Sequence, residues 1–194
     1  MEKTFRPKFL DKEIIEMRKE KLKEQYKSLT EGVYMDGEIR DFERQDILNT
    51  ISVMLPKDFI MMPEDYAQIK YTSFRPQHLI TDKKMNVNIG FSLFPNNLKN
   101  KNVQRVAEQI REVLDSEEAG LNFGMCKKLE NLEAWWFDFR SHSMDSDVYN
   151  ILLVIIVNHK ILKVVGNCKI QDELDWKPVF LQIFESIEPI KEEV

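Results

Sequence analysis

The sequence has 194 residues, of which 43% are hydrophobic and 10% aromatic, a composition typical of one globular domain. The formal net charge is −5, but residues 1–30 carry nine Lys and Arg against six Asp and Glu, while the remaining residues carry 19 against 27. Because phosphate-backbone binding relies on clustered Lys and Arg, this acidic body argues against a nucleic-acid partner.

Two further observations concern location and cofactors. The opening residues lack the apolar stretch of an export signal, and the longest apolar run, Ile151 to Val157, is too short to cross a bilayer as a helix. We therefore expect a cytoplasmic protein with no membrane partner. Cys126 and Cys168 stand outside any CxxC spacing and are expected to be buried free thiols. The chain also lacks a Gly-rich phosphate loop, so no cofactor is expected.

The N-terminal segment is rich in helix formers. Residues 11–29 predict a charged, weakly amphipathic helix that begins at Asp11 as its N-cap. Such a charge run is typical of a solvated face; the alternatives are a docking arm for another protein and a helix that pairs between chains in a homodimer. Thr30 to Gly37 predicts a connector. We expect residues 1–36 to precede a single α+β domain formed by residues 37–194.

The middle of the chain alternates between strand and helix patterns. Residues 51–55 place apolar side chains at every second position, which predicts a strand that Pro56 ends, and residues 87–93 repeat the pattern. From 100 to 115 the apolar spacing becomes helical, with Asn100 or Asn102 as the N-cap.

The C-terminal half predicts the centre of the fold. Residues 149–157 are apolar at both alternating sets of positions, as in a strand covered on both faces. Asn158-His159 predicts a two-residue turn into a partner strand, residues 160–170. The spacing of residues 176–187 predicts an amphipathic helix that lies on the sheet, with Asp175 as its cap and Pro178 in its first turn.

This order of elements resembles the PsbP-like fold superfamily, which includes photosystem II extrinsic proteins, Ran-binding nuclear import factors and bacterial DcrB-type proteins. The resemblance covers residues 45–189, and the chain looks like a bacterial-type member. It is carried by a strand ending in Leu-Pro (51–56), YTSFRP (71–76), VNIGFSL (87–93), WWFDFRS (135–141), DVYN (147–150) and a terminal helix with Trp176, Ile183, Ser186 and Ile187. It implies an antiparallel sheet of about six strands flanked by helices, and members that act mostly by binding other proteins.

Residues 135–140 supply the candidate binding face. In a strand, Trp135, Phe137 and Phe139 point to one side, and Trp136, Asp138 and Arg140 to the other. A second helix layer covers Trp136 in one interpretation. In the other, the exposed set Trp136, Asp138 and Arg140, with Arg75, forms a contact surface for a partner protein.

The segment DFRSHSMDSDVYN, residues 138–150, offers catalytic and metal-ligating residue types. Ser141, His142 and Asp145 are neighbours whose side chains alternate in an extended chain, so a Ser/His/Asp triad is not favoured. His142, Asp145 and Asp147 are candidate metal ligands, although no known ligand spacing supports them. The simplest interpretation is a polar turn in which Asp145 and Asp147 satisfy backbone groups.

The leading hypothesis is therefore a non-catalytic protein-binding or adaptor domain. The alternative is a metal-dependent or hydrolase-like activity in which Arg75, His78, His142 and Asp145 converge in one pocket. A self-associating structural protein, paired through its N-terminal helices, is the third possibility.

Overall fold

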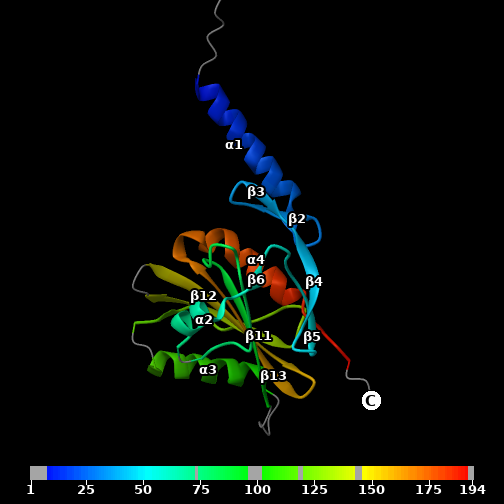
Figure 1. Ribbon diagram of the computed structural model, residues 1–194, viewed down its shortest axis with the longest axis vertical. Coiled ribbons are helices and arrows are strands. Elements are labelled where there is room, and N and C mark those ends of the chain that lie inside the picture. Colours follow the sequence, from blue (N-terminus) through cyan, green and yellow to red (C-terminus); the bar gives the residue numbers. More distant parts are fainter. Residues whose placement is uncertain (1–7, 73, 96–101, 118–119, 143–145, 192–194) are drawn as a thin grey trace, which may run out of the picture.

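The computed structural model describes residues 8–72, 74–95, 102–117, 120–142 and 146–191, with side chains from residue 12 onward. Within these residues the chain forms four α-helices and three antiparallel sheets (Figure 1). The helices are α1 (Lys8–Gln25), α2 (Glu64–Lys70), α3 (Val103–Glu117) and α4 (Glu173–Glu185). The predicted α+β class is confirmed.

The largest sheet has eight strands among the described residues, and three of these have only two residues. Its order is β10 (Lys127–Lys128), β11 (Ala134–His142), β12 (Asp147–Val157), β13 (Lys160–Lys169), β8 (Asn88–Pro95), β7 (His78–Thr81) and β6 (Ile60–Met61), with β9 (Asn122–Phe123) also paired to β11. The five longer strands form the body of the sheet.

Two small sheets adjoin it. One consists of β1 (Lys27–Ser28), β2 (Gly32–Met35) and β3 (Glu38–Arg40). The other consists of β14 (Glu188–Pro189), β5 (Ile51–Pro56) and β4 (Phe42–Ile47). The strand predicted at 51–55 therefore exists, but it belongs to this second small sheet.

The hairpin of β12 and β13 is the centre of the molecule. Asn158 and His159 both have positive φ, at 48° and 58°, which suits a two-residue hairpin turn and matches the prediction for these residues. Positions 150–155 of β12 are all buried, because both faces of the sheet are covered there.

The two faces have different covers. α3 packs on one face through Val103, Val106 and Ala107, which contact Phe137 and Leu152. On the other face lie α4 and the sheet β14-β5-β4, and their side chains join one large core. In Figure 1, α3 and α4 accordingly lie on opposite sides of the large sheet.

The start of α3 confirms Asn102 as the predicted N-cap residue. The Arg105 backbone N–H donates to Asn102 Oδ1 at 3.2 Å, as expected of an N-cap residue. Asn100 lies outside the described residues.

The start of α4 differs from the prediction. A 3₁₀ turn, Ile170–Asp172, leads directly into the helix, which therefore begins at Glu173. Asp175 lies inside the helix and is not its cap, and Pro178 lies beyond the first turn. The helix face predicted from Trp176, Phe180 and Ile183 is nevertheless buried as expected.

The N-terminal segment also differs. α1 begins at Lys8, so Asp11 is inside the helix and does not cap it, and the helix ends at Gln25. The segment expected as a connector contains β2, which pairs with both β1 and β3. Its alternating Val33 and Met35 are buried in the main core with Leu29, and this packing is why the segment is ordered as a strand.

Candidate functional site

Asp138 is the centre of a polar network between the large sheet and α4. β11 places Asp138 near Tyr149 of β12, whose phenol O–H donates to Asp138 Oδ2 at 3.1 Å. Lys177 of α4 donates from Nζ to the same oxygen at 2.6 Å. Burial and the Asp138 carboxylate raise the pKa of Tyr149, so the phenol stays protonated as a donor. One carboxylate therefore links two strands to the helix above them.

Arg140 and Glu173 extend this network. Arg140 Nη2 lies 2.9 Å from Glu173 Oε2, and the Arg140 side chain is 56% exposed. These groups line a polar pocket of about 260 Å³. A Cβ at Gly124 would collide with the Asp138 carboxylate, so the close approach requires glycine. Within this pocket, Asp138 is paired with Lys177 and Glu173 with Arg140.

Trp136 lies beneath this network. The predicted alternation is confirmed, since Phe137 packs toward α3 while Trp136 joins the opposite core. Trp136 is only 7% exposed. The ammonium groups of Lys127 and Lys177 lie 5.5 and 5.9 Å from its ring centroid. Of the three β11 residues in the predicted contact face, Arg140 is therefore the one that faces solvent.

The polar segment predicted as a turn includes the end of β11, at His142, and the start of β12, at Asp147. His142 Nδ1 and Asp147 Oδ1 are 2.7 Å apart, and both side chains are exposed. Asp145 lies outside the described residues. Among the residues that are described, no three His, Cys, Asp or Glu side chains gather as a metal site would require.

Arg75 and His78 occupy a different part of the molecule. Arg75 forms a bidentate ion pair with Glu64 of α2. The hydrogen bonds from the Arg75 guanidinium lower the pKa of Glu64 to about 2. His78 begins β7 and lies edge-on to Phe91, and burial lowers its pKa. Strands β8, β13 and β12 separate β7 from β11, so Arg75 and His78 do not converge with His142.

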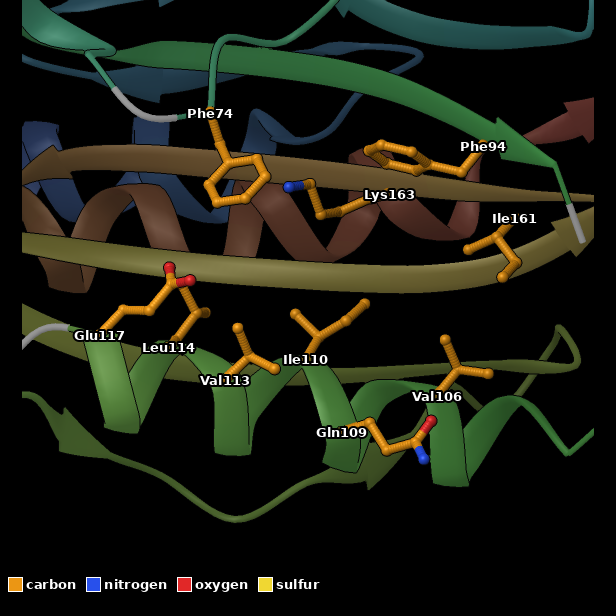
Figure 2. Close-up of a pocket in the computed structure, with 10 residues that line it drawn as sticks. All are labelled: Phe74, Phe94, Val106, Gln109, Ile110, Val113, Leu114, Glu117, Ile161 and Lys163. Atoms are coloured by element: carbon orange, nitrogen blue, oxygen red, sulfur yellow. The ribbon is translucent and has the colours of Figure 1, made fainter. Parts of the chain in front are cut away.

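An apolar groove is a feature that the sequence patterns did not indicate. It lies between α3 and the strands β8 and β13 and has a volume of about 310 Å³ (Figure 2). One wall is formed by the α3 side chains Val106, Ile110, Val113 and Leu114. Ile161 and Lys163 of β13 form the floor, and Phe74 and Phe94 line the side opposite α3.

Lys163 is a positively charged residue that lines this groove. Its Nζ lies 5.5 Å from the ring centroid of Phe74 and 5.6 Å from that of Phe94. Burial among these side chains lowers the pKa of the Lys163 ammonium. No ion pair between Lys163 and a carboxylate is formed within the described parts of the chain.

α1 is the second exposed apolar feature. Figure 1 shows that this helix extends away from the body. Ile14, Ile15 and Met17 are 54%, 53% and 69% exposed. Among the described residues, the C-terminal end of this helix packs on the body, where Leu22 is half-buried and Lys23 Nζ lies 3.6 Å from Asp175.

Comparisons with known proteins support the fold. No family model matches the sequence, and no curated protein matches it. Among solved structures, cyanobacterial PsbP (CyanoP) from Synechocystis sp. PCC 6803 is similar with a TM-score of 0.56 at 12% identity, over 82% of this chain and 98% of that one. A mutant form of the protein Mog1 gives a TM-score of 0.54 at 8% identity, over 76% and 95%.

A third similar structure is LpqN, involved in cell envelope biogenesis of Mycobacterium tuberculosis, with a TM-score of 0.50 at 15% identity over 73% of this chain and 83% of that one. These likenesses show an α+β domain of the PsbP-like fold, as the order of elements in the sequence predicted. Within the described residues, none of the helices is both long and apolar enough to span a membrane.

Proposed function

We propose that this protein is a non-catalytic module that binds another protein, and that α1 is its docking arm. The observation that carries the proposal is the set Ile14, Ile15 and Met17, which stands in solvent on a helix extending from the body (Figure 1). The PsbP-like fold is compatible with such a role, since the resemblance implies proteins that act mostly by binding.

The physical argument concerns the stability of an unsupported helix. A helix of 18 residues that is charged and mostly solvated is marginal in water, because helices in proteins gain most of their stability from packing. Burying the exposed apolar side chains of α1 against a partner would supply that packing. An amphipathic helix laid into a groove is a recurring mode of protein recognition.

Arg140 and Arg75 are included in the proposal as further contact residues. Their guanidinium side chains are 56% and 42% exposed. Each is held in place by a carboxylate, Glu173 or Glu64, so an incoming partner would meet a guanidinium whose position is already restricted. Asp138 and Trp136 lie near Arg140 on β11, whereas Arg75 forms a separate contact point beside α2.

A cytoplasmic location belongs to the same proposal. It is supported by the two free cysteines, which suit a reducing compartment. Cys168 is buried, and this burial raises its thiol pKa to about 12, whereas Cys126 is half-buried with a raised pKa.

The test is affinity capture from the native host with four forms of the chain. These are the full chain, a chain that starts at Tyr26, the variant Ile14→Gln with Met17→Gln, and the control Leu174→Gln. Glutamine keeps helix propensity while removing apolar surface. Leu174 is 88% exposed and lies outside α1, so it controls for the loss of any exposed apolar side chain. Starting at Tyr26 keeps Leu29, Val33 and Met35 in the core.

We expect the full chain and the Leu174→Gln control to retain one stoichiometric protein, which the two α1 variants lose. The complex should then re-form from the purified components with the same dependence. A partner retained equally by all four forms would contradict the role of α1. If light scattering instead shows a dimer of this chain that the α1 variants convert to monomer, the partner is a second copy.

A further inference from the structure

The groove beside α3 has a chemical character that protein binding through α1 does not use. Its walls are apolar side chains of α3 and the rings of Phe74 and Phe94, and Lys163 stands between these rings (Figure 2). Small-molecule sites typically have this composition: a mainly apolar concave surface of at least about 300 Å³ with a few polar groups that fix orientation.

Lys163 determines which polar group would fit. An ammonium group moved into apolar surroundings loses hydration, and Lys163 is partly buried among the apolar side chains of the groove, which lowers its pKa. Cation–π contacts with the two rings compensate for part of the lost hydration free energy. An anionic group placed beside Nζ would compensate for more of it, because a charge-assisted hydrogen bond is stronger in such surroundings than in water.

The direction of the groove sets the shape of the occupant. In Figure 2 the Lys163 amine points toward Phe74, while Ile110, Val106 and Ile161 continue the groove away from it. An acidic head at Lys163 would therefore be followed by an apolar chain or ring that lies along these aliphatic side chains. The carboxylate of Glu117 lies at the same end of the groove as the Lys163 amine, and Val106 lies at the opposite end. The hydrocarbon part would therefore extend away from Glu117, and the acidic head would have to bind on the Lys163 side of this end.

We propose that this groove binds a small amphiphilic carboxylic acid, with the carboxylate on Lys163 and the hydrocarbon part along α3. Lysine presents one compact charge, which suits a singly charged head. This site is independent of the proposed contact through α1, because it uses none of the exposed residues of that helix.

The test is isothermal titration of the full chain with three probes at concentrations below micelle formation: decanoate, decanol and decyltrimethylammonium. We expect decanoate to bind one site about tenfold or more tightly than decanol, which is the gain typical of one hydrogen bond to a charged group. Raising the pH until the Lys163 ammonium loses its proton should reduce the affinity for decanoate and leave that for decanol unchanged.

Two matched variants locate the site. Lys163→Met keeps an apolar side chain of similar length, so we expect it to fold and to bind decanoate no more tightly than decanol. Lys127→Met removes another lysine that lies over an aromatic ring, Trp136, and should bind as the wild type does. Failure of decanoate to bind, equal binding of all three probes, or unchanged decanoate affinity in Lys163→Met would each overturn the proposal.

Discussion

The two faces of the large sheet are covered in different ways. On the α4 face, Leu153, Val164 and Phe180 are fully buried, and α4 is itself backed by β5 and β14. On the α3 face, the helix covers β11 and β12, while toward β13 and β8 an open groove leaves Phe94 40% exposed. The α4 face thus holds the larger hydrophobic core, whereas the α3 face is only partly covered.

Polar contacts strengthen the α4 face further. The Met54 backbone N–H of β5 donates to Ser186 Oγ at 3.0 Å, and Ser186 Oγ donates to the Ile183 carbonyl oxygen at 2.7 Å. Arg44 of β4 donates to the Ser186 carbonyl oxygen at 3.2 Å. The C-terminal end of α4 is thus tied to the small sheet.

Neighbouring leucines on β12 give the strongest test of this difference, because they point to opposite faces. Leu153 is in the core beneath α4, and Leu152 is in the cluster beneath α3. We expect Leu153→Ala to lower the free energy of unfolding by about 4 kcal/mol and Leu152→Ala by about 2–3 kcal/mol, since the α3 side relaxes more easily around a cavity. Urea unfolding measures both; a larger loss for Leu152→Ala would contradict the comparison.

Gly166 tests how tightly α4 is seated. A Cβ at this position would come within 2.7 Å of the Phe180 ring. Gly166→Ala should therefore cost about 1–3 kcal/mol of unfolding free energy through overpacking. Adding Phe180→Leu makes room for the new methyl group, so the double variant should lose less than the sum of the two single changes. Strict additivity would show that the ring does not limit the site.

Lys163 tests the α3 face. Replacing this partly desolvated cation by Met should raise the free energy of unfolding at neutral pH by about 1 kcal/mol. Because burial lowers the Lys163 pKa, the unfolded chain binds more protons than the native one as pH approaches the ordinary lysine value, so wild-type stability rises there. The advantage of Lys163→Met should therefore shrink between pH 7 and pH 10, as urea unfolding with Lys127→Met as control would measure.

His142 should show the smallest effect. Its contact with Asp147 is exposed, with side chains 72% and 52% accessible. Exposed ion pairs contribute little, so His142→Ala should change the free energy of unfolding by no more than about 0.5 kcal/mol. Thermal unfolding would measure this change. A larger loss of stability would mean that the contact between His142 and Asp147 contributes to the stability of the sheet.

Much of the fold could be predicted because the deciding signals are local. The apolar run of 149–157, the turn at Asn158 and the helical spacing after Asn102 each depend on a few neighbouring residues, and each is found in the structure. β4 was not predicted, since only Phe42 and Ile47 at its ends are buried and the residues between them are polar.

The groove could not be predicted, because it depends on contacts between distant segments. Phe74 and Lys163 become neighbours only when β8 pairs with β13 and α3 lies across β12. The burial of Trp136 had a similar cause: alternation placed it opposite Trp135, but only the position of α4 decides that this side is covered. Arg140 was exposed as predicted.

The outer strands of the large sheet have a consequence for the behaviour of concentrated solutions. The sheet ends in two-residue strands, β6 on one side and β10 on the other, and β10 consists of Lys127 and Lys128. Strand edges that are short or carry lysines give another chain little backbone to pair with. The longer strands of this sheet lie inside it, so pairing of the large sheet with another chain requires β10 or β6 to detach first.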